Sequence, residues 1–430
     1  MNRIKCLSLA LCMIAGVAWA KDDNNFYLKS GDTVVFYGDS ITDQRLYTII
    51  VETYVATRYP KLDVSFIDSG WGGDRVSGGE GGSIDTRLKR DVFAYHPSVV
   101  TVMLGMNDGG YKAETESNDA IYFAGYRHIV DSLHANLPQV RITAIQPSPY
   151  DDVTRTPSIP VAGGYQYNDV LRSFGKWIAN YAPQAGIDVA DMNTAVVSAL
   201  TQAHDIDPVL AKEIIADHVH PGFAGHMVMA EQLVKAWKGR NVVSSVTIDA
   251  SRPAIKVESA EFAKATELST SGTIAWTELD DSLPLPYKQW EDMWGGGPTI
   301  GLILKSTDLI SALNEQQLKV KGLSAGTYSL KIDGESVGAF NNDQLAAGIN
   351  LALLKTPATE QAMKVYHLAA SHQEVHVDWW RNVSMPLADY MLPEANAAVD
   401  AMTALDKTLA KKVREVAQPA PHKFELSPVQ

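Results

Sequence analysis

A short apolar stretch that ends at a serine constrains the fold of this chain more than any other feature. Residues 33–37 (TVVFY) are β-branched or aromatic, as is typical of a buried strand, and Gly38-Asp39 is a turn signal that ends it. Apolar side chains recur at helical spacing over residues 44–58, so a helix follows the turn. Ser40 therefore lies at a strand-to-helix corner, where it either caps the helix or lies beside N–H groups able to stabilise an oxyanion.

Further apolar runs predict four more strands, separated by segments of helical spacing. The strands are expected at residues 64–67, 99–104, 140–145 and 187–190, and the helices at 84–94, 120–136, 167–181 and 194–203. Strands that alternate with helices form a parallel sheet covered on both faces. We predict a three-layer α/β/α sandwich with a mostly parallel five-stranded sheet, in which loops after the strands' carboxyl ends form the site.

Two motifs follow the second and third predicted strands. In SGWGGDR, residues 69–75, small residues expose backbone N–H groups, either to a ligand or merely in a tight turn. In LGMND, residues 104–108, Asn107 follows a buried strand, and its amide either donates to a ligand or stabilises the turn. Both motifs are expected on the same rim of the sheet as Ser40.

An acid and an imidazole lie three residues apart in DHVHPG, residues 217–222. A turn of this length brings the Asp217 carboxylate to one ring nitrogen of His220 and leaves the other free for a nucleophile. His218 is the alternative base, although its side chain is expected on the opposite side of the turn. A metal site is the other interpretation, but no HExxH motif or second carboxylate cluster accompanies these residues, so we predict no metal and no cofactor.

Four motifs in this order, GDSIT, SGWGGD, GMND and DHVHPG, make residues 33–237 resemble the SGNH hydrolase superfamily, also called the GDSL esterase and lipase family. The resemblance implies an SGNH or flavodoxin-like fold and a serine hydrolase that forms an acyl-enzyme. In the family's pattern Ser40 is the nucleophile, His220 its general base and Asp217 the residue that orients the histidine.

The same resemblance implies an oxyanion hole. Its donors would be the backbone N–H groups of Ser40 and Gly73 and the side chain of Asn107, with Gly72 as the alternative to Gly73. Charge that builds on a carbonyl oxygen needs such donors already in place.

Four charged residues that flank these positions are interpreted as structural. The acids are expected to accept backbone hydrogen bonds in turns, and the arginines to form salt bridges. They are Asp39, Asp108, Arg45 and Arg75.

Residues 1–20 have the pattern of a signal peptide, with Arg3 and Lys5 before a short apolar run and Ala18-Trp19-Ala20 at its end. We therefore expect a secreted or periplasmic protein that begins near residue 21. Both cysteines of the chain, Cys6 and Cys12, lie within this segment. A lipid anchor at Cys12 is the alternative, but Leu11 stands where a small residue is expected.

The net charge of −13 argues against nucleic acid as a partner, because it repels phosphate. Outside the signal segment no apolar run approaches 18 residues, so stable membrane insertion is not expected. The charge suits an enzyme that meets a neutral substrate, and the sequence leaves the oligomeric state open.

After the hydrolase domain at residues 21–240, the pattern changes to a C-terminal mixed α+β region at 241–430. Strands are expected at 242–248, 254–257, 273–277, 318–320 and 328–332, and helices at 356–372 and 394–416. Asp333-Gly334 indicates a hairpin turn. Tryptophans of this region form either a sugar-binding surface or core and interdomain packing: Trp276, Trp290, Trp294, Trp379 and Trp380.

The loops at residues 109–117 and 147–164 carry Tyr111 and Tyr150 and are candidate substrate walls. Polar and aromatic walls suit a sugar better than a long acyl chain. We therefore predict a serine esterase that hydrolyses short-chain acyl esters, above all acetyl, on a small-molecule or polysaccharide substrate. The alternatives are a lysophospholipase, arylesterase or thioesterase of the same superfamily, or a carbohydrate-binding module with an inactive hydrolase domain.

Overall fold

A computed structural model describes residues 25–156, 166–251, 255–270, 272–293, 296–390 and 392–429. The signal segment 1–20, Trp294 and most of the second half of the loop at 147–164 lie outside the described residues.

The N-terminal part is built on a parallel sheet with the strand order β2-β1-β5-β6-β7. Its strands are β1 (Thr33–Gly38), β2 (Ser65–Gly70), β5 (Val99–Met103), β6 (Arg141–Ile145) and β7 (Asp188–Ala190). The central strands β1 and β5 are buried along almost their whole length, as expected of a parallel sheet covered on both faces. The predicted five-stranded sheet is confirmed, with strand ends displaced by a few residues at most.

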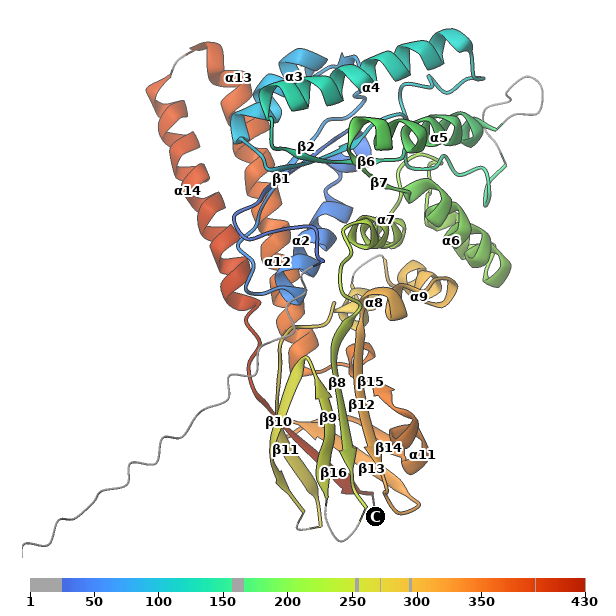
Figure 1. Ribbon diagram of the computed structural model, residues 1–430, viewed down its shortest axis with the longest axis vertical. Coiled ribbons are helices and arrows are strands. Elements are labelled where there is room, and N and C mark those ends of the chain that lie inside the picture. The colour runs from blue at the N-terminus through green and yellow to red at the C-terminus, as the bar shows by residue number, and fades with distance from the viewer. Residues whose placement is uncertain are drawn as a thin grey trace, which may run out of the picture.

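Helices cover both faces of this sheet (Figure 1). One layer consists of α3 (Ile84–Asp91), α4 (Glu116–Asn136) and α5 (Tyr167–Ala185), and the other contains α2 (Leu46–Arg58), α7 (Phe223–Ala236) and, beside α7, α6 (Met192–Ile206). The helix predicted over residues 44–58 is α2, and a separate short helix, α1 (Ser40–Asp43), precedes it, because Arg45 has φ +61° and interrupts the helical backbone. The three-layer α/β/α prediction is confirmed.

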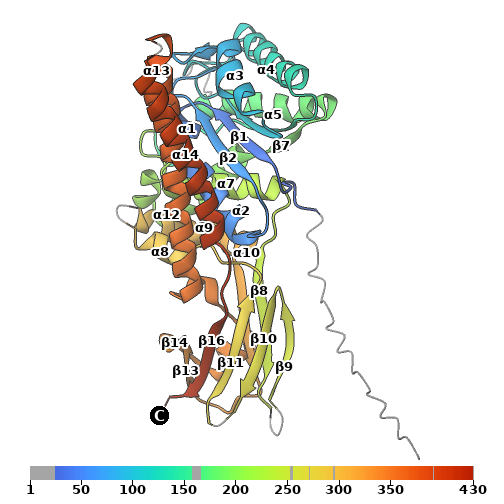
Figure 2. The same cartoon turned by 90° about the vertical axis from the view of Figure 1, so that its left-hand side faces the viewer.

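The C-terminal part contains two sheets that pack face to face around a second core (Figures 1 and 2). The first has the order β15-β12-β8-β9 and the second β10-β11-β16-β13-β14. The strands are β8 (Val242–Asp249), β9 (Lys256–Glu261), β10 (Ala263–Ser269), β11 (Ile274–Asp280), β12 (Glu315–Lys321), β13 (Thr327–Ile332), β14 (Glu335–Asn341), β15 (Ile349–Asn350) and β16 (His422–Pro428). The mixed α+β prediction for this region is confirmed.

Helices from the C-terminal part return to the first core. These are α8 (Tyr287–Glu291), α9 (Gly297–Ser306), α10 (Leu309–Leu313), α12 (Pro357–Val377) and α14 (Pro393–Val416), and α12 continues into the π-helix η4 (Asp378–Ser384). We call residues 357–416 the C-terminal arm. It lies along α2 and the β2 edge of the sheet, and Ala362, Val365 and Val413 belong to the same hydrophobic cluster as β1.

The predicted boundary at 240/241 falls between α7 and β8, yet side chains from both sides of it share one core. Three of the candidate sugar-binding tryptophans are packing residues instead: Trp276, Trp290 and Trp380 are at most 3% exposed. Trp276 stacks on Phe424 of β16 within the second core, which leaves no face for a sugar. Trp379 is half-buried.

Among the described residues, none of the helices combines the length and the apolar character required to cross a membrane.

Candidate active site

Ser40 is the first residue of α1, and Asp39 alone separates it from β1. The preceding Asp39 caps this helix, because its side chain accepts a hydrogen bond of 3.0 Å from the Ile41 N–H. The corner is tight: a Cβ at Gly38 would lie 2.1 Å from Thr42 Oγ1. This packing places the Ser40 hydroxyl at the end of the strand, as the turn signal predicts.

Ser40, His220 and Asp217 form a continuous chain of polar contacts across 180 residues of sequence. Ser40 Oγ lies 2.9 Å from His220 Nε2, and His220 Nδ1 lies 2.7 Å from Asp217 Oδ2. The other Asp217 oxygen accepts the backbone N–H groups of Val219 at 2.9 Å and His220 at 2.7 Å. One oxygen of the carboxylate thus closes the turn and the other orients the imidazole.

Asp217 is held as a carboxylate. Partial burial acts to raise its pKa, but the hydrogen bonds from the backbone and ring of His220 and from Val219 together bring the pKa below its ordinary value. A negative charge at this point favours the His220 tautomer that carries its proton on Nδ1 and leaves Nε2 to accept one.

His218 points elsewhere, as the sequence predicts. Its backbone has φ +70°, its Nδ1 lies 2.8 Å from the Asp151 carbonyl oxygen, and its ring stacks on Tyr150 at 5.0 Å between centroids. Of the two histidines in the motif, the structure brings His220 alone to Ser40.

The start of α1 and the glycine loop after β2 present backbone N–H groups that are free to bind a ligand in the part of the chain that the structure describes. Gly73 has φ +75°, in a turn closed by the 3.1 Å hydrogen bond from the Asp74 N–H to the Trp71 carbonyl. Within the described part of the chain, the N–H groups of Ser40, Gly72 and Gly73 donate to no acceptor, so Gly72 stays an alternative to Gly73. The Trp71 N–H donates to the Gly38 carbonyl at 3.0 Å, which ties this glycine loop to the end of β1.

The Asn107 side chain lies against the same loop. Its Nδ2 donates to the Asp74 carbonyl at 3.0 Å, and its Oδ1 accepts from the Tyr111 hydroxyl at 3.2 Å. An amide nitrogen carries two hydrogens, so one remains for a ligand. Tyr111 thus fixes which end of the amide faces the loop, a role that sequence reasoning missed because it depends on the φ of +55° at Tyr111.

The flanking charged residues have structural partners. Asp108 accepts the Val76 N–H at 2.9 Å, and Arg75 donates to the Asn107 carbonyl at 3.1 Å. Arg45 lies 3.3 Å from Asp43 and 3.1 Å from Glu374 of the C-terminal arm.

A fully buried ionic cluster supports the glycine loop. Arg87 of α3 donates to Asp74 at 2.9 Å, contacts Asp91, and also donates to the Ser69 carbonyl at 2.8 Å. None of these three charged side chains is exposed to solvent. The position of Gly73 therefore depends on an arginine that the sequence motifs do not single out.

Burial, assisted by the negative charges of Asp108 and Asp74, raises the pKa of Asp39 to about 7, against an ordinary value of 3.8. The folded protein therefore keeps a proton on Asp39 that the unfolded chain loses above pH 4. The contribution of Asp39 to the free energy of unfolding therefore falls as the pH rises from 4 to 7, and it stays low above pH 7.

We accordingly compare the free energy of unfolding of Asp39→Asn with that of wild type at two pH values. We expect the variant's value relative to wild type to be higher at pH 8 than at pH 5 by about 2 kcal/mol or more. Asparagine keeps the oxygen that caps Ile41 and cannot ionise. Urea unfolding at both pH values measures the effect, with Asp131→Asn on the exposed face of α4 as the control. If the variant and wild type differed in free energy of unfolding by the same amount at both pH values, the raised pKa of Asp39 would be contradicted.

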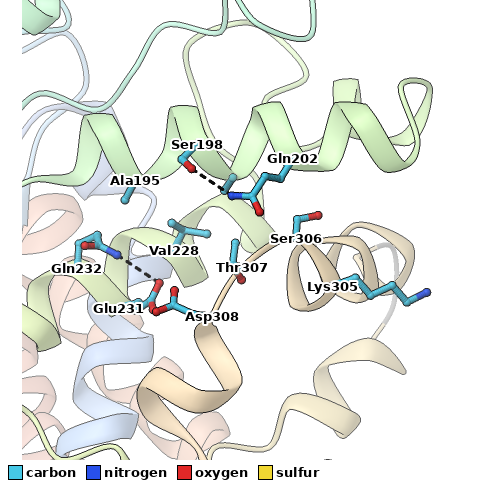
Figure 3. A pocket seen from close by; sticks show the side chains of 11 residues that line it. Ala195, Ser198, Gln202, Val228, Glu231, Gln232, Lys305, Ser306, Thr307 and Asp308 are labelled. Atoms are coloured by element: carbon cyan, nitrogen blue, oxygen red, sulfur yellow. Dashed lines mark hydrogen bonds between the residues drawn. The ribbon is translucent and has the colours of Figure 1, made fainter.

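A separate cleft of about 460 Å³ lies between α6, α7 and the α9–α10 junction (Figure 3). Its buried Glu231 lies 2.8 Å from Lys235, which also lies 3.1 Å from Asp308. Lys235 is thus shared between two carboxyl groups, and Ser40 and His220 are not among the lining residues of the cleft.

This chain is similar to known ester hydrolases. The profile of the GDSL-like lipase/acylhydrolase family matches residues 36–228. An acetylxylan esterase of Geobacillus stearothermophilus is 24% identical over 225 residues, which cover 48% of this chain and 94% of that protein.

Among solved structures, a gut microbial diltiazem-metabolizing enzyme is 25% identical and superposes with a TM-score of 0.81, over 94% of this chain and 98% of that one. The structure of an acetylxylan esterase from Geobacillus stearothermophilus is 21% identical, with a TM-score of 0.40, and covers 50% of this chain and 97% of that one. The first likeness extends through the C-terminal part.

Proposed function

Since residues 36–228 form a GDSL-like lipase/acylhydrolase domain of the SGNH hydrolase superfamily, we propose that this protein is a serine esterase that removes short acyl groups, above all acetyl, from a carbohydrate. The observation that carries the proposal is the contact chain from Ser40 Oγ through His220 to Asp217, at 2.9 and 2.7 Å. A serine is a weak nucleophile until a base takes its proton, and this chain provides the base and its orienting carboxylate.

In the proposed first step, Ser40 Oγ attacks the carbonyl carbon of the ester while His220 Nε2 takes the hydroxyl proton. The carbonyl oxygen becomes an oxyanion that the N–H groups of Ser40 and Gly73 and the Asn107 amide stabilise. His220 then returns the proton to the departing alcohol, and an acyl-enzyme remains on Ser40.

The second step repeats the first with water. His220 takes a proton from water, which attacks the acyl carbonyl through a second oxyanion. When the carbon–oxygen bond to Ser40 breaks, His220 gives the proton back to the serine and the carboxylic acid leaves.

Two features favour a short acyl group on a sugar. A relative by sequence is an acetylxylan esterase, and the half-buried Tyr111 lies beside Asn107 at the rim, backed by the buried rings of Tyr150 and Tyr167 at 5.0 to 6.4 Å between centroids. Aromatic faces beside polar groups are suited to sugar rings. Export through the signal segment at residues 1–20 is part of the proposal, because a polysaccharide substrate lies outside the cytoplasm.

Initial rates on p-nitrophenyl acetate, butyrate and octanoate test the acyl preference, with the Ser40→Ala protein as the background. We expect kcat/KM for acetate to exceed that for octanoate at least tenfold. Hydrolysis rates on acetylated xylooligosaccharides and on diltiazem, which is itself an acetate ester, then show whether the enzyme prefers a sugar or a drug-like alcohol.

A preference for octanoate would replace this proposal with a lipid-ester hydrolase. A folded wild type no faster than background on every ester would favour the carbohydrate-binding alternative.

A further inference from the structure

The C-terminal arm reaches the candidate active site at the π-helix η4. Segments of this kind are rare in proteins and frequently occur at functional sites. η4 continues α12 without a break and carries Trp380 and Arg381 to the loop after β2 that bears Gly73. Figure 2 shows α12 and α14 running beside the sheet strands β1 and β2.

Arg381 joins the two segments that carry the candidate catalytic groups. Its Nη1 lies 2.5 Å from Asp43 Oδ1, and its guanidinium lies 4.2 Å from the centroid of the Trp71 ring. Asp43 is in α1, three residues after Ser40, and Trp71 immediately precedes Gly72-Gly73. One side chain of the arm therefore holds the nucleophile's helix and the glycine loop together.

Trp380 makes a second connection to the same loop. Its Nε1 donates to Asp91 Oδ1 at 2.9 Å, and its ring meets that of Trp71 edge to face at 5.9 Å. Asp91 is the carboxylate that also binds Arg87, whose other partner is Asp74, next to Gly73. The arm thus contacts the loop from the Trp71 side and, through the buried ionic cluster, from the Asp74 side.

We propose that Arg381 is a positioning residue for the oxyanion donors, so that the catalytic site is complete only with the C-terminal arm in place. This inference rests on the proposed function. Oxyanion donors act because they are fixed before charge develops, and a small displacement of Gly73 relative to Ser40 weakens transition-state binding more than substrate binding. Arginine suits the position, since its planar guanidinium can stack on an indole and bind a carboxylate at the same time.

Substitution of Arg381 leaves the local charges paired. Asp43 keeps Arg45 as a partner at 3.3 Å, and Arg381 and Asp43 are partly exposed, at 20% and 22%. The Arg381→Met protein is therefore expected to fold.

The test compares Arg381→Met with Arg414→Met in the full chain. Arg414 also joins the arm to the N-terminal part, through a 3.1 Å contact with Asp63, but touches neither Asp43 nor Trp71. For Arg381→Met on p-nitrophenyl acetate we expect kcat to fall about tenfold with KM within about twofold of wild type. Arg414→Met should keep wild-type kcat, and Arg381→Lys, which restores the ion pair without the stack, should recover part of the loss.

A second readout separates this inference from the proposed function. A fluorophosphonate probe forms an O–P bond to Ser40 Oγ as fluoride leaves, and His220 takes the serine proton. The phosphoryl oxygen of the probe develops negative charge at the same oxyanion donors as the ester carbonyl. The labelling rate, followed by mass spectrometry, should therefore fall for Arg381→Met and remain unchanged for Arg414→Met.

Each outcome decides the inference. If wild type labels but hydrolyses no ester, the proposed substrate class fails, and a labelling rate that is slower in Arg381→Met alone still supports the positioning role. Equal kcat and labelling in both methionine variants would overturn it, as would a wild type that does not label at Ser40.

Discussion

Replacing Ser40 by alanine is expected to lower kcat on acetate esters by about 10⁴-fold or more. The variant retains His220, Asp217 and the oxyanion donors, but has no atom to form the acyl-enzyme. Its fold should be unaffected, because Asp39 rather than Ser40 caps α1. Steady-state rates together with thermal unfolding measure both expectations.

The two histidines of the DHVHPG motif provide a matched control for the same mechanism. His220→Ala should lose activity to a similar extent, because nothing else within reach of Ser40 Oγ accepts its proton in the described structure. His218→Ala removes an imidazole two residues away that binds the Asp151 carbonyl, so its kcat should stay within about tenfold of wild type. Comparable losses for the two alanine variants would contradict the assignment of the base.

Replacing Arg87 by methionine is expected to lower the free energy of unfolding by about 3–5 kcal/mol. Methionine fills much of the same volume but leaves the Asp74 and Asp91 carboxylates buried without their shared cation. Urea unfolding followed by circular dichroism measures the change. Activity should fall with it, since Gly73 is adjacent to Asp74.

Arg90→Met is the control for this second prediction. Arg90 also binds Asp91, at 2.6 Å, but its side chain is 30% exposed, and Asp91 keeps Arg87 and the Trp380 N–H as partners. We expect a loss of about 1 kcal/mol. If both methionine variants lost the same free energy, full burial of Arg87 would not be the cause of its effect.

Most of the N-terminal fold is predictable from local patterns. The runs at residues 33–37, 99–104 and 140–145 lie within a residue of β1, β5 and β6, because buried parallel strands require continuous apolar residues and the following turns are marked by glycine, asparagine or proline. In the C-terminal part, residues 356–372 and 394–416 predict α12 and α14, and Asp333-Gly334 predicts the hairpin of β13 and β14. The apolar pattern does not predict β10, β15 and β16. β10 is largely exposed and charged, β15 has two residues, and β16 has only two buried apolar side chains, Phe424 and Leu426.

The candidate site also contains residues that local patterns predict and residues that they do not. Ser40, Gly73, Asn107, Asp217 and His220 were chosen from short motifs, since turn chemistry and strand ends are encoded locally. Tyr111 is marked locally only as a candidate substrate wall, because its hydrogen bond to Asn107 depends on the backbone conformation of the loop. Arg87 is not marked at all, because its role depends on meeting Asp74 and Asp91 in the folded protein.

Local patterns thus account for the parallel sheet and for the rim on which the polar motifs gather, because both follow from periodicity and turns. The roles of the candidate catalytic residues come from the resemblance to the SGNH hydrolase superfamily. The tertiary structure alone decided that residues 357–416 return to the first core and bring Arg381 to Asp43, 338 positions away. Such a contact arises from the burial of apolar faces on helices that are far apart in the chain. A charged residue in an amphipathic helix has the same local pattern whether it meets solvent or a catalytic loop.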